Sequence, residues 1–211
     1  MKLPIILIWL FAAFMPFTCS DENISRKVSD EVLPFQLVYN GGFEEHSLRK
    51  QIPARWFKPH SNTLLDHEIY RWDNDIFHSG DHSVSIEIPS NHQEIPASFY
   101  WTQTLNNFQA GHTYKLRAWV KTKNLSRSAW IKIMFPDKFH HSFVLSASTI
   151  ESSRLTGTSD WKEIILLFTI PPGTRRVLIK TGLDTIGNSG GKVWFDDIQI
   201  YEEDYLKWYE I

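Results

Sequence analysis

The sequence predicts an all-β fold, an antiparallel β-sandwich, on three observations. Apolar and polar residues alternate with a period of two, as in residues 84–88, where valine and isoleucine alternate with serine and glutamate, and this is the pattern of a half-buried strand. Turn residues separate such runs at short intervals, as in Pro171-Pro172-Gly173. After residue 18 no long stretch has a helical period, except a short segment near residues 205–208. Short strands with this spacing are typical of β-sandwiches.

The expected strands run through the whole domain, which we place at residues 35–203. Each combines alternation, or β-branched and aromatic residues, with a turn signal at its end. They are predicted at residues 84–88, 114–121, 130–135, 143–147, 161–170, 177–183 and 193–201. In residues 114–121 the even-numbered positions are apolar, so Arg117 and Trp119 are expected to point outward together. Residues 19–34 are polar and charged, as expected of a linker, and residues 204–211 are expected to form a tail.

The first 18 residues are expected to be a signal peptide. Met1 and Lys2 give a positive start, and the segment from Leu3 to Thr18 is an almost unbroken apolar run. It is shorter than the roughly 20 residues of a transmembrane helix and has the length of an export signal. The protein is therefore expected to be exported.

Cys19 is the only cysteine in the chain, so the exported domain is expected to contain no internal disulfide. It follows the apolar run directly, and with the acidic segment Ser20–Asn23 it resembles the signal of bacterial lipoproteins. The resemblance implies that Cys19 is lipidated as the first mature residue and that the protein is anchored at a bacterial outer membrane or cell surface. Pro16-Phe17-Thr18 departs from the usual lipoprotein signal. Ordinary cleavage after Ser20, giving a periplasmic or secreted protein, is therefore an alternative.

Charge and motif content argue against nucleic-acid binding and against catalysis. The 22 basic and 24 acidic residues give a net charge of −2, without the basic excess of nucleic-acid-binding proteins. The expected turn Gly187-Asn188-Ser189-Gly190-Gly191 has the Gly-x-Ser-x-Gly spacing but lacks the context of a nucleophile elbow, and no motif selects a carboxylate pair for glycoside hydrolysis. The nine histidines lack a zinc signature, and the adjacent His140 and His141 would point to opposite faces of a strand. An enzyme is therefore not predicted, and a small polysaccharide-active enzyme is a minor alternative.

An ordered set of short motifs spans the expected domain. It consists of Asn40-Gly41-Gly42-Phe43-Glu44, Trp56, His78-Ser79-Gly80-Asp81-His82-Ser83, Gln103-Thr104-Leu105, Ala110-Gly111-His112-Thr113-Tyr114, Ala118-Trp119-Val120-Lys121, Ser159-Asp160-Trp161-Lys162 and Val193-Trp194-Phe195-Asp196-Asp197-Ile198. In order and spacing this set resembles the carbohydrate-binding modules of the cellulase C type. The resemblance covers about residues 36–202 and implies a galactose-binding-domain-like jelly roll.

The resemblance also implies a structural calcium ion that joins the first and last strands. Glu44 and Asp196 would supply carboxylates to it. Asn40, or alternatively Gly41, and the turn at Asp81 would supply carbonyl oxygens or a further side chain. These groups suit Ca²⁺, which takes roughly six to eight oxygen ligands. The alternative is that the acidic residues are strand-end charges facing water.

Three pairs of residues are expected to form a sugar-binding surface. They are Trp101 and Gln103, Arg117 and Trp119, and Trp130 and Lys132. The members of each pair are two residues apart, so they share one face of a strand, which we expect to be the outer face. Sugar rings stack their C–H faces on aromatic side chains, while polar side chains bond to their hydroxyl groups. The resemblance likewise implies a glycan on the concave sheet and its rim loops. Each tryptophan is alternatively a packing residue.

The sequence therefore predicts noncatalytic binding of a polysaccharide or oligosaccharide by an exported β-sandwich module. Modules of this type normally accompany glycoside hydrolases, and this chain has no room for a catalytic domain. A surface structural or protein-interaction module of the same fold, without sugar binding, is the main alternative. An outward cleft of aromatic and polar side chains would favour a glycan, and a flat apolar patch would favour a protein partner.

Overall fold

Alternating side chains divide the strands between an interior and an outer face. In β4 (Thr113–Leu125), the even-numbered residues from Tyr114 to Val120 are buried, while Arg117 is exposed and Trp119 is partly exposed. This confirms the orientation that the sequence predicts for residues 114–121. The computed structural model describes residues 35–47, 52–59, 69–91, 96–136, 143–148 and 155–203, and of residues 143–148 the backbone alone.

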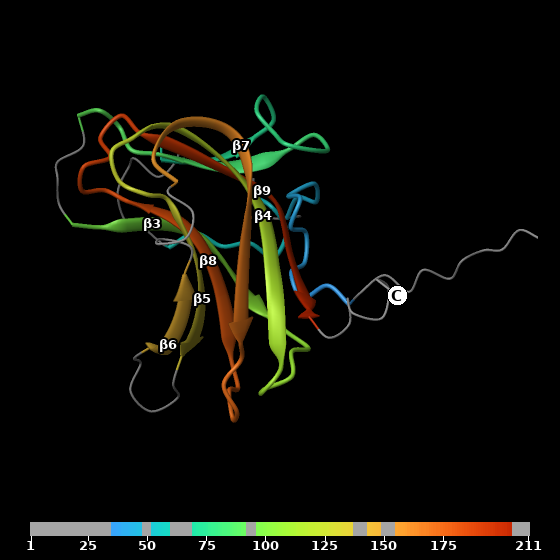
Figure 1. Cartoon of the computed structure of the whole chain (residues 1–211). Coiled ribbons are helices and arrows are strands. Elements are labelled where there is room, and N and C mark those ends of the chain that lie inside the picture. The colour runs from blue at the N-terminus through green and yellow to red at the C-terminus, as the bar shows by residue number, and fades with distance from the viewer. Residues whose placement is uncertain are drawn as a thin grey trace, which may run out of the picture. The chain divides into compact units, whose positions relative to one another are not determined.

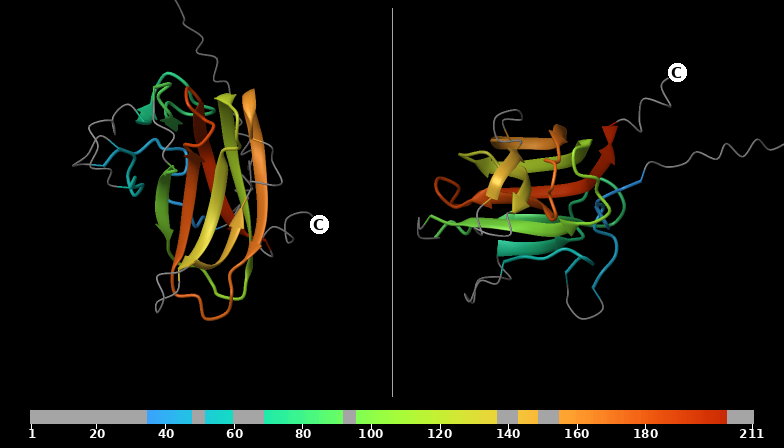
Figure 2. Two further views of the ribbon diagram at one scale, coloured as in Figure 1. Left: turned by 90° about the vertical axis from the view of Figure 1, so that its left-hand side faces the viewer. Right: turned by 90° about the horizontal axis from the view of Figure 1, so that it is seen from below.

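The strands form two antiparallel sheets, which confirms the predicted β-sandwich (Figure 1). The five-stranded sheet has the order β1 (Tyr70–Asp73), β2 (Ser83–Glu87), β9 (Lys192–Glu202), β4 and β7 (Gly157–Thr169). The four-stranded sheet has the order β3 (Ser98–Leu105), β8 (Val177–Asp184), β5 (Trp130–Pro136) and β6 (Phe143–Ser148). Figure 2 shows the two sheets as stacked layers. Strands from distant parts of the chain pair in each sheet, as β2 does with β9 and β3 with β8, so side chains far apart in sequence meet on one face.

The core lies between the inner faces of the two sheets. Ile86 of β2, Leu116 of β4 and Phe195 of β9 come from one sheet, and Ile133 and Ile179 come from the other; all five are fully buried. Burying one such side chain stabilises a fold by roughly 1.5–3 kcal/mol relative to leaving it in water. The apolar positions that the sequence alternation marks are therefore the ones that hold the sheets together.

The first described segment is tied to the last strand. The N–H of Leu37 donates to the carbonyl of Ile200 at 3.1 Å, and the N–H of Ile198 donates to the carbonyl of Gly41 at 2.9 Å. A Cβ atom at Gly41 would lie 1.9 Å from the carbonyl oxygen of Ile198. Only glycine allows this approach, which gives the Asn-Gly-Gly motif a structural reason.

Several expectations concern residues outside the described ranges. They are the signal peptide at residues 1–18, the lipidated Cys19, the linker at residues 19–34, the histidines His140 and His141, and the tail at residues 204–211. Within the described part of the chain, no helix is long and apolar enough to cross a membrane.

Candidate functional site

The outer face of the four-stranded sheet brings aromatic and charged side chains from three strands together. Strand register places Tyr100 of β3 and Trp130 of β5 on either side of Gly182 of β8. The next row outward places Thr102, Lys180 and Lys132 opposite one another. Residues that pair across antiparallel strands point to the same face. We call these six residues together with Asp184 the sheet face.

Trp130 lies directly over Gly182. A Cβ atom at Gly182 would lie 2.5 Å from the Cη2 atom of the Trp130 ring, so the absence of a side chain makes room for the indole. The indole N–H donates to Oδ1 of Asp184 at 3.1 Å, and the Lys132 ammonium lies 4.0 Å from the ring centroid. Trp130 is only 2% exposed. Trp130 therefore lies on the outer face with Lys132, as predicted, but its burial is that of the alternative, a packing residue.

Tyr100 supplies the partly exposed ring of the sheet face. Its ring centroid lies 6.2 Å from that of Trp130, with the two planes tilted by 45°. The ammonium group of Lys180 lies 4.0 Å from the Tyr100 ring centroid. An ammonium group thus lies against each of the two rings, in contacts of the cation–π type. A ring that faces such a group can also face the C–H surface of a sugar once the flexible lysine moves aside.

Trp101 and Gln103 share one face of β3, as expected, but it is the inner face. Trp101 is 1% exposed, and its indole N–H donates to the carbonyl of Ser85 across the sandwich at 3.3 Å. Gln103 is 4% exposed because its carboxamide bonds to the backbone of Tyr39, accepting from the N–H at 2.9 Å and donating to the carbonyl at 2.8 Å. The expectation that these two side chains point outward is therefore wrong.

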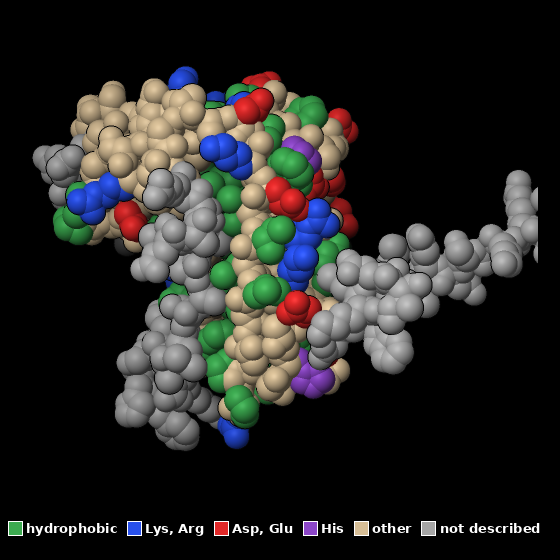
Figure 3. All heavy atoms as spheres, viewed as in Figure 1, with side chains coloured by type: hydrophobic (Ala, Val, Ile, Leu, Met, Phe, Trp, Pro, Cys, Tyr) green, Lys and Arg blue, Asp and Glu red, His purple; other side chains and the backbone are tan. Residues whose placement is uncertain are grey.

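Arg117 and Trp119 lie on the outer face of the other sheet. Arg117 forms an ion pair with Glu163 of β7, with an Nε–Oε1 distance of 2.6 Å. Trp119 stacks on the imidazole of His78 with a centroid distance of 3.9 Å and an interplanar angle of 13°. Figure 3 shows acidic and basic side chains side by side over β4 and β7. The six residues expected at one surface therefore fall on three: the interior, the sheet face and the outer face of the five-stranded sheet.

Two of the expected calcium ligands approach one turn, residues 78–82. Glu44 accepts the backbone N–H groups of Asp81 and His82 at 3.1 and 3.2 Å. Asp196 is fully buried, and its carboxylate accepts the N–H groups of His78 and Ser79 at 2.8 and 3.2 Å. Burial, with a smaller contribution from the charge of Asp197, raises the pKa of Asp196 to about 7.

The other two expected ligands have different surroundings. The carboxamide of Asn40 accepts the N–H of Glu45 at 3.0 Å and donates to the carbonyl of Glu45 at 2.8 Å, so it closes a turn of its own. Asp81 is exposed. Over the residues that the structure describes, no group of three or more His, Cys, Asp and Glu side chains is arranged to hold a metal ion. The carboxylates of Glu44 and Asp196 suit calcium, whereas the carboxamide of Asn40 is already bonded to the backbone of Glu45.

Solved structures share this fold, whereas no protein-family model and no curated protein matches the chain. The carbohydrate-binding module TmCBM61, solved in complex with β-1,4-galactotriose, matches with a TM-score of 0.51 and 17% identity over 80% of this chain and 99% of that one. The chain has the β-sandwich fold of carbohydrate-binding modules. A proposed sugar-binding protein from Bacteroides thetaiotaomicron matches with a TM-score of 0.54 and 13% identity over 80% of this chain and all of that one. An arabinose-bound α-L-arabinofuranosidase matches with a TM-score of 0.53 and 16% identity, over 82% of this chain but 27% of the enzyme.

Tyr100, Lys180 and Gly182 belong to the sheet face but were not predicted as site residues. Tyr100 lies next to Trp101 on β3, and the face that carries Trp101 was expected to point outward, so Tyr100 was expected to point inward. Lys180 lies in a predicted strand, but only the pairing of β8 with β3 and β5 brings it between the two aromatic residues. A signal for Tyr100 was present, because Phe99 and Leu105 continue the apolar face of Trp101.

Proposed function

We propose that the protein binds a glycan noncatalytically at the sheet face. The observation that carries this proposal is the pairing of Tyr100 and Trp130 around Gly182, with the ammonium groups of Lys132 and Lys180 over their rings. Aromatic rings supply the apolar surface on which a sugar stacks, and the lysines supply hydrogen-bond donors for its hydroxyl groups. Binding would require the lysine side chains to turn from the rings toward the ligand.

The charge pattern of the sheet face supports binding without hydrolysis. Hydrolysis of a glycosidic bond ordinarily uses two carboxyl groups on opposite sides of the bond. Among the described residues of the sheet face, Asp184 is the one carboxylate. Its Oδ1 atom already accepts the hydroxyl of Ser98 at 2.6 Å and the indole N–H of Trp130. Asp184 therefore serves to hold Trp130 in place.

The structural relatives favour the same ligand class. TmCBM61 was solved with β-1,4-galactotriose, and the Bacteroides relative is a proposed sugar-binding protein. We propose a polysaccharide or oligosaccharide ligand here by analogy of fold. We also propose that the protein is exported and anchored through a lipid on Cys19, on the strength of the N-terminal apolar segment.

A panel of plant and microbial polysaccharides in affinity gel electrophoresis tests the proposal. The wild-type protein should be retarded by at least one of them, and Tyr100→Ala should lose at least roughly tenfold in affinity, since a stacking ring in a binding site commonly contributes about 1–3 kcal/mol. Leu167→Ala is the matched control, because Leu167 is a large side chain that is 54% exposed on the opposite sheet. Equal retardation of wild type and Tyr100→Ala would exclude the sheet face as the site.

A protein-interaction role is the second candidate. Ile165 and Leu167 of β7 are 47% and 54% exposed on the outer face of the five-stranded sheet, and β7 lies at its edge. Exposed apolar side chains on an edge strand are a common feature of protein contacts. This candidate would be favoured if no polysaccharide retards the wild-type protein and if Leu167→Ala changes its oligomeric state.

We further propose a structural calcium ion held by Glu44 and Asp196. The two carboxylates come from opposite ends of the chain and approach the same turn, and a cation there would offset the burial of the Asp196 charge. The ion would stabilise the contact between the termini of the domain without taking part in ligand chemistry. Calcium removal should therefore lower the melting temperature in differential scanning calorimetry. An unchanged melting temperature after removal verified by elemental analysis would contradict this proposal.

A further inference from the structure

A groove lies beside β3, away from the indole of Trp130. It has a volume of about 610 Å³, and its lining includes Phe35, Tyr39, Arg55, Phe57, Asn106 and Asn107. We call it the Tyr39 groove. Its volume falls within the roughly 300–1,000 Å³ of small-molecule pockets, so it can hold a sugar unit.

Three aromatic side chains of the Tyr39 groove are open to solvent. Phe35, Tyr39 and Phe57 are 57%, 49% and 54% exposed. They are three of the six large apolar side chains that are exposed among the described residues. Trp130 and Trp101, in contrast, are almost fully buried. The groove therefore offers more accessible ring surface than the sheet face does.

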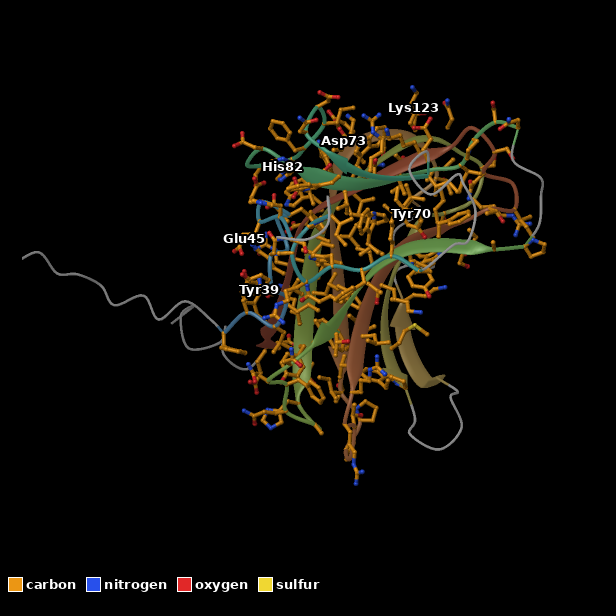
Figure 4. The ribbon with its side chains drawn as sticks, turned by 180° about the vertical axis from the view of Figure 1, so that it is seen from behind. Tyr39, Glu45, Tyr70, Asp73, His82 and Lys123 are labelled. Carbon is orange, nitrogen blue, oxygen red and sulfur yellow. The ribbon has the colours of Figure 1, made fainter. Side chains whose placement is uncertain are left out.

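The ring of Tyr39 is held in position before any ligand binds. Gln103 bonds to both the N–H and the carbonyl of Tyr39, and the Tyr39 hydroxyl donates to Oε2 of Glu45. The hydrogen bond to Glu45 raises the pKa of Tyr39 above its usual value, so the phenol keeps its proton. Figure 4 shows Tyr39 and Glu45 on the same side of the described unit. A ring fixed in this way loses little freedom on binding.

The backbone around the groove adopts an unusual conformation. Asn40, Arg55 and Asn107 line it with positive φ angles of 51°, 65° and 59°. Non-glycine residues adopt this conformation at a cost, and they are concentrated at ligand-binding sites. The positive φ angle of Arg55 is the most unusual of the three, because asparagine adopts the left-handed region more readily than arginine does. Its conformation directs a guanidinium toward the ring of Tyr39, 5.9 Å from the ring centroid.

Among the described residues that line the groove, Arg55 is also the one that carries a formal charge. It is exposed, and no ion pair joins it to a carboxylate in the described part of the chain. A guanidinium offers a planar fork of donors that matches a carboxylate. The side chains of Asn106 and Asn107 add donors and acceptors for hydroxyl groups. Flat rings, amides and one unpaired guanidinium together suit a sugar that carries a carboxylate.

The Tyr39 groove adjoins the sheet face through Phe57. The N–H of Phe57 donates to the carbonyl of Thr102 at 2.9 Å, and the N–H of Thr102 donates to the carbonyl of Phe57 at 2.8 Å. Residues paired in this way share a face, so the ring of Phe57 lies on the same side of the sheet as Thr102. The groove and the sheet face therefore form one continuous surface across the edge of β3.

We propose that the Tyr39 groove is a second saccharide-binding site, which takes a uronic acid unit by pairing its carboxylate with Arg55 and stacking its ring on Tyr39 or Phe57. This inference shares with the proposed function only the ligand class, since it uses different residues.

The test compares uronic acid oligosaccharides with their own carboxyl-reduced, neutral forms by isothermal titration calorimetry. The panel contains oligogalacturonates, oligomannuronates and glucuronoxylan fragments. For at least one of them, the wild-type protein should bind the acidic form roughly tenfold or more tightly than the reduced form, as a charge-assisted bidentate pair requires. Higher salt should narrow the difference.

Variants assign the binding to the groove. Arg55→Gln should abolish the preference for the acidic form, while Arg55→Lys should keep part of it. Tyr39→Ala should weaken the binding of both forms, and Tyr39→Phe, which keeps the ring but loses the hydrogen bond to Glu45, should weaken it less. If Tyr39→Ala melts at a lower temperature than the wild-type protein, Phe57→Ala serves as a second variant that removes a ring from the groove. Tyr100→Ala should leave the acidic preference unchanged, so failure at the sheet face and failure at the groove are distinguishable. No acidic preference in any pair, or a preference that survives Arg55→Gln, would overturn the proposal.

Discussion

Replacing Gly182 by alanine tests the geometry of the sheet face. The added Cβ atom would lie 2.5 Å from the ring of Trp130 and 2.6 Å from the carbonyl oxygen of Phe99. Neither neighbour moves freely, because one is backbone and the other is an indole bonded to Asp184. Overpacking of this kind costs about 1–3 kcal/mol. Since each kcal/mol shifts the melting temperature of a domain of this size by roughly 2–4 °C, we expect a decrease of roughly 2–12 °C.

Differential scanning calorimetry measures the decrease, and fluorescence of the tryptophans reports the displaced indole. Gly42→Ala is the matched control, because its Cβ atom would find its nearest neighbour, Oδ1 of Asp197, at an ordinary 3.6 Å. That control should change the stability by no more than about 0.5 kcal/mol. Equal melting temperatures for Gly182→Ala and Gly42→Ala would mean that the Trp130 indole does not lie over Gly182.

Three further predictions concern other parts of the domain. Because burial raises the pKa of Asp196 to about 7 from 3.8, the folded state holds this proton more tightly than the unfolded state. In calcium-free buffer the stability that this proton contributes should be present below about pH 4 and lost as the pH rises through 7, by up to roughly 4 kcal/mol. Urea unfolding at pH 5 and pH 8 measures the loss. Equal free energies of unfolding at the two pH values would contradict the raised pKa of Asp196. Trp101→Ala should lower the free energy of unfolding by about 3–5 kcal/mol. A much smaller decrease, measured by urea unfolding, would show that Trp101 is not in the interior. Arg117→Ala should change it by less than about 1 kcal/mol, because the pair with Glu163 is exposed, and a larger loss would mean that this pair supports the fold.

The strands themselves were largely predictable, because the alternation of apolar and polar residues follows directly from the burial of one face of a strand. The seven expected strands match β2, β4, β5, β6, β7, β8 and β9 of the structure to within a few residues. The predicted orientation of β4 was correct because apolar and charged residues alternate from Tyr114 to Lys121, with Trp119 as the one exception. β1 was missed because it is four residues long and contains the polar residues Arg71 and Asp73.

The orientation of β3 was harder to predict because both of its faces carry aromatic and polar residues. Phe99, Trp101 and Leu105 form the inner side, and Gln103 interrupts it. Gln103 is tolerated there because the backbone of Tyr39 satisfies its carboxamide, and this partner is more than sixty residues away along the chain. The local sequence around Gln103 therefore does not predict this hydrogen bond.

The candidate sites depend on strand pairing, which the sequence does not state. Trp119 and Trp130 both lie outward on neighbouring strands of the sequence, yet they belong to different sheets. Tyr100, Gly182 and Trp130 meet because β8 lies between β3 and β5. The Tyr39 groove likewise combines two N-terminal segments with the end of β3. Residue types are visible in a sequence, whereas their combination on one face requires the topology.

The most direct test of glycan binding follows the indole N–H signals of the tryptophans by NMR while an oligosaccharide that the protein retains is added. The Trp130 signal, assigned with Trp130→Phe, lies at the hydrogen bond to Asp184 within the sheet face. It should shift saturably with the ligand, while the signals of the buried Trp56 and Trp194 should stay in place. A titration that saturates without moving the Trp130 signal would show that sugar binds elsewhere on the protein.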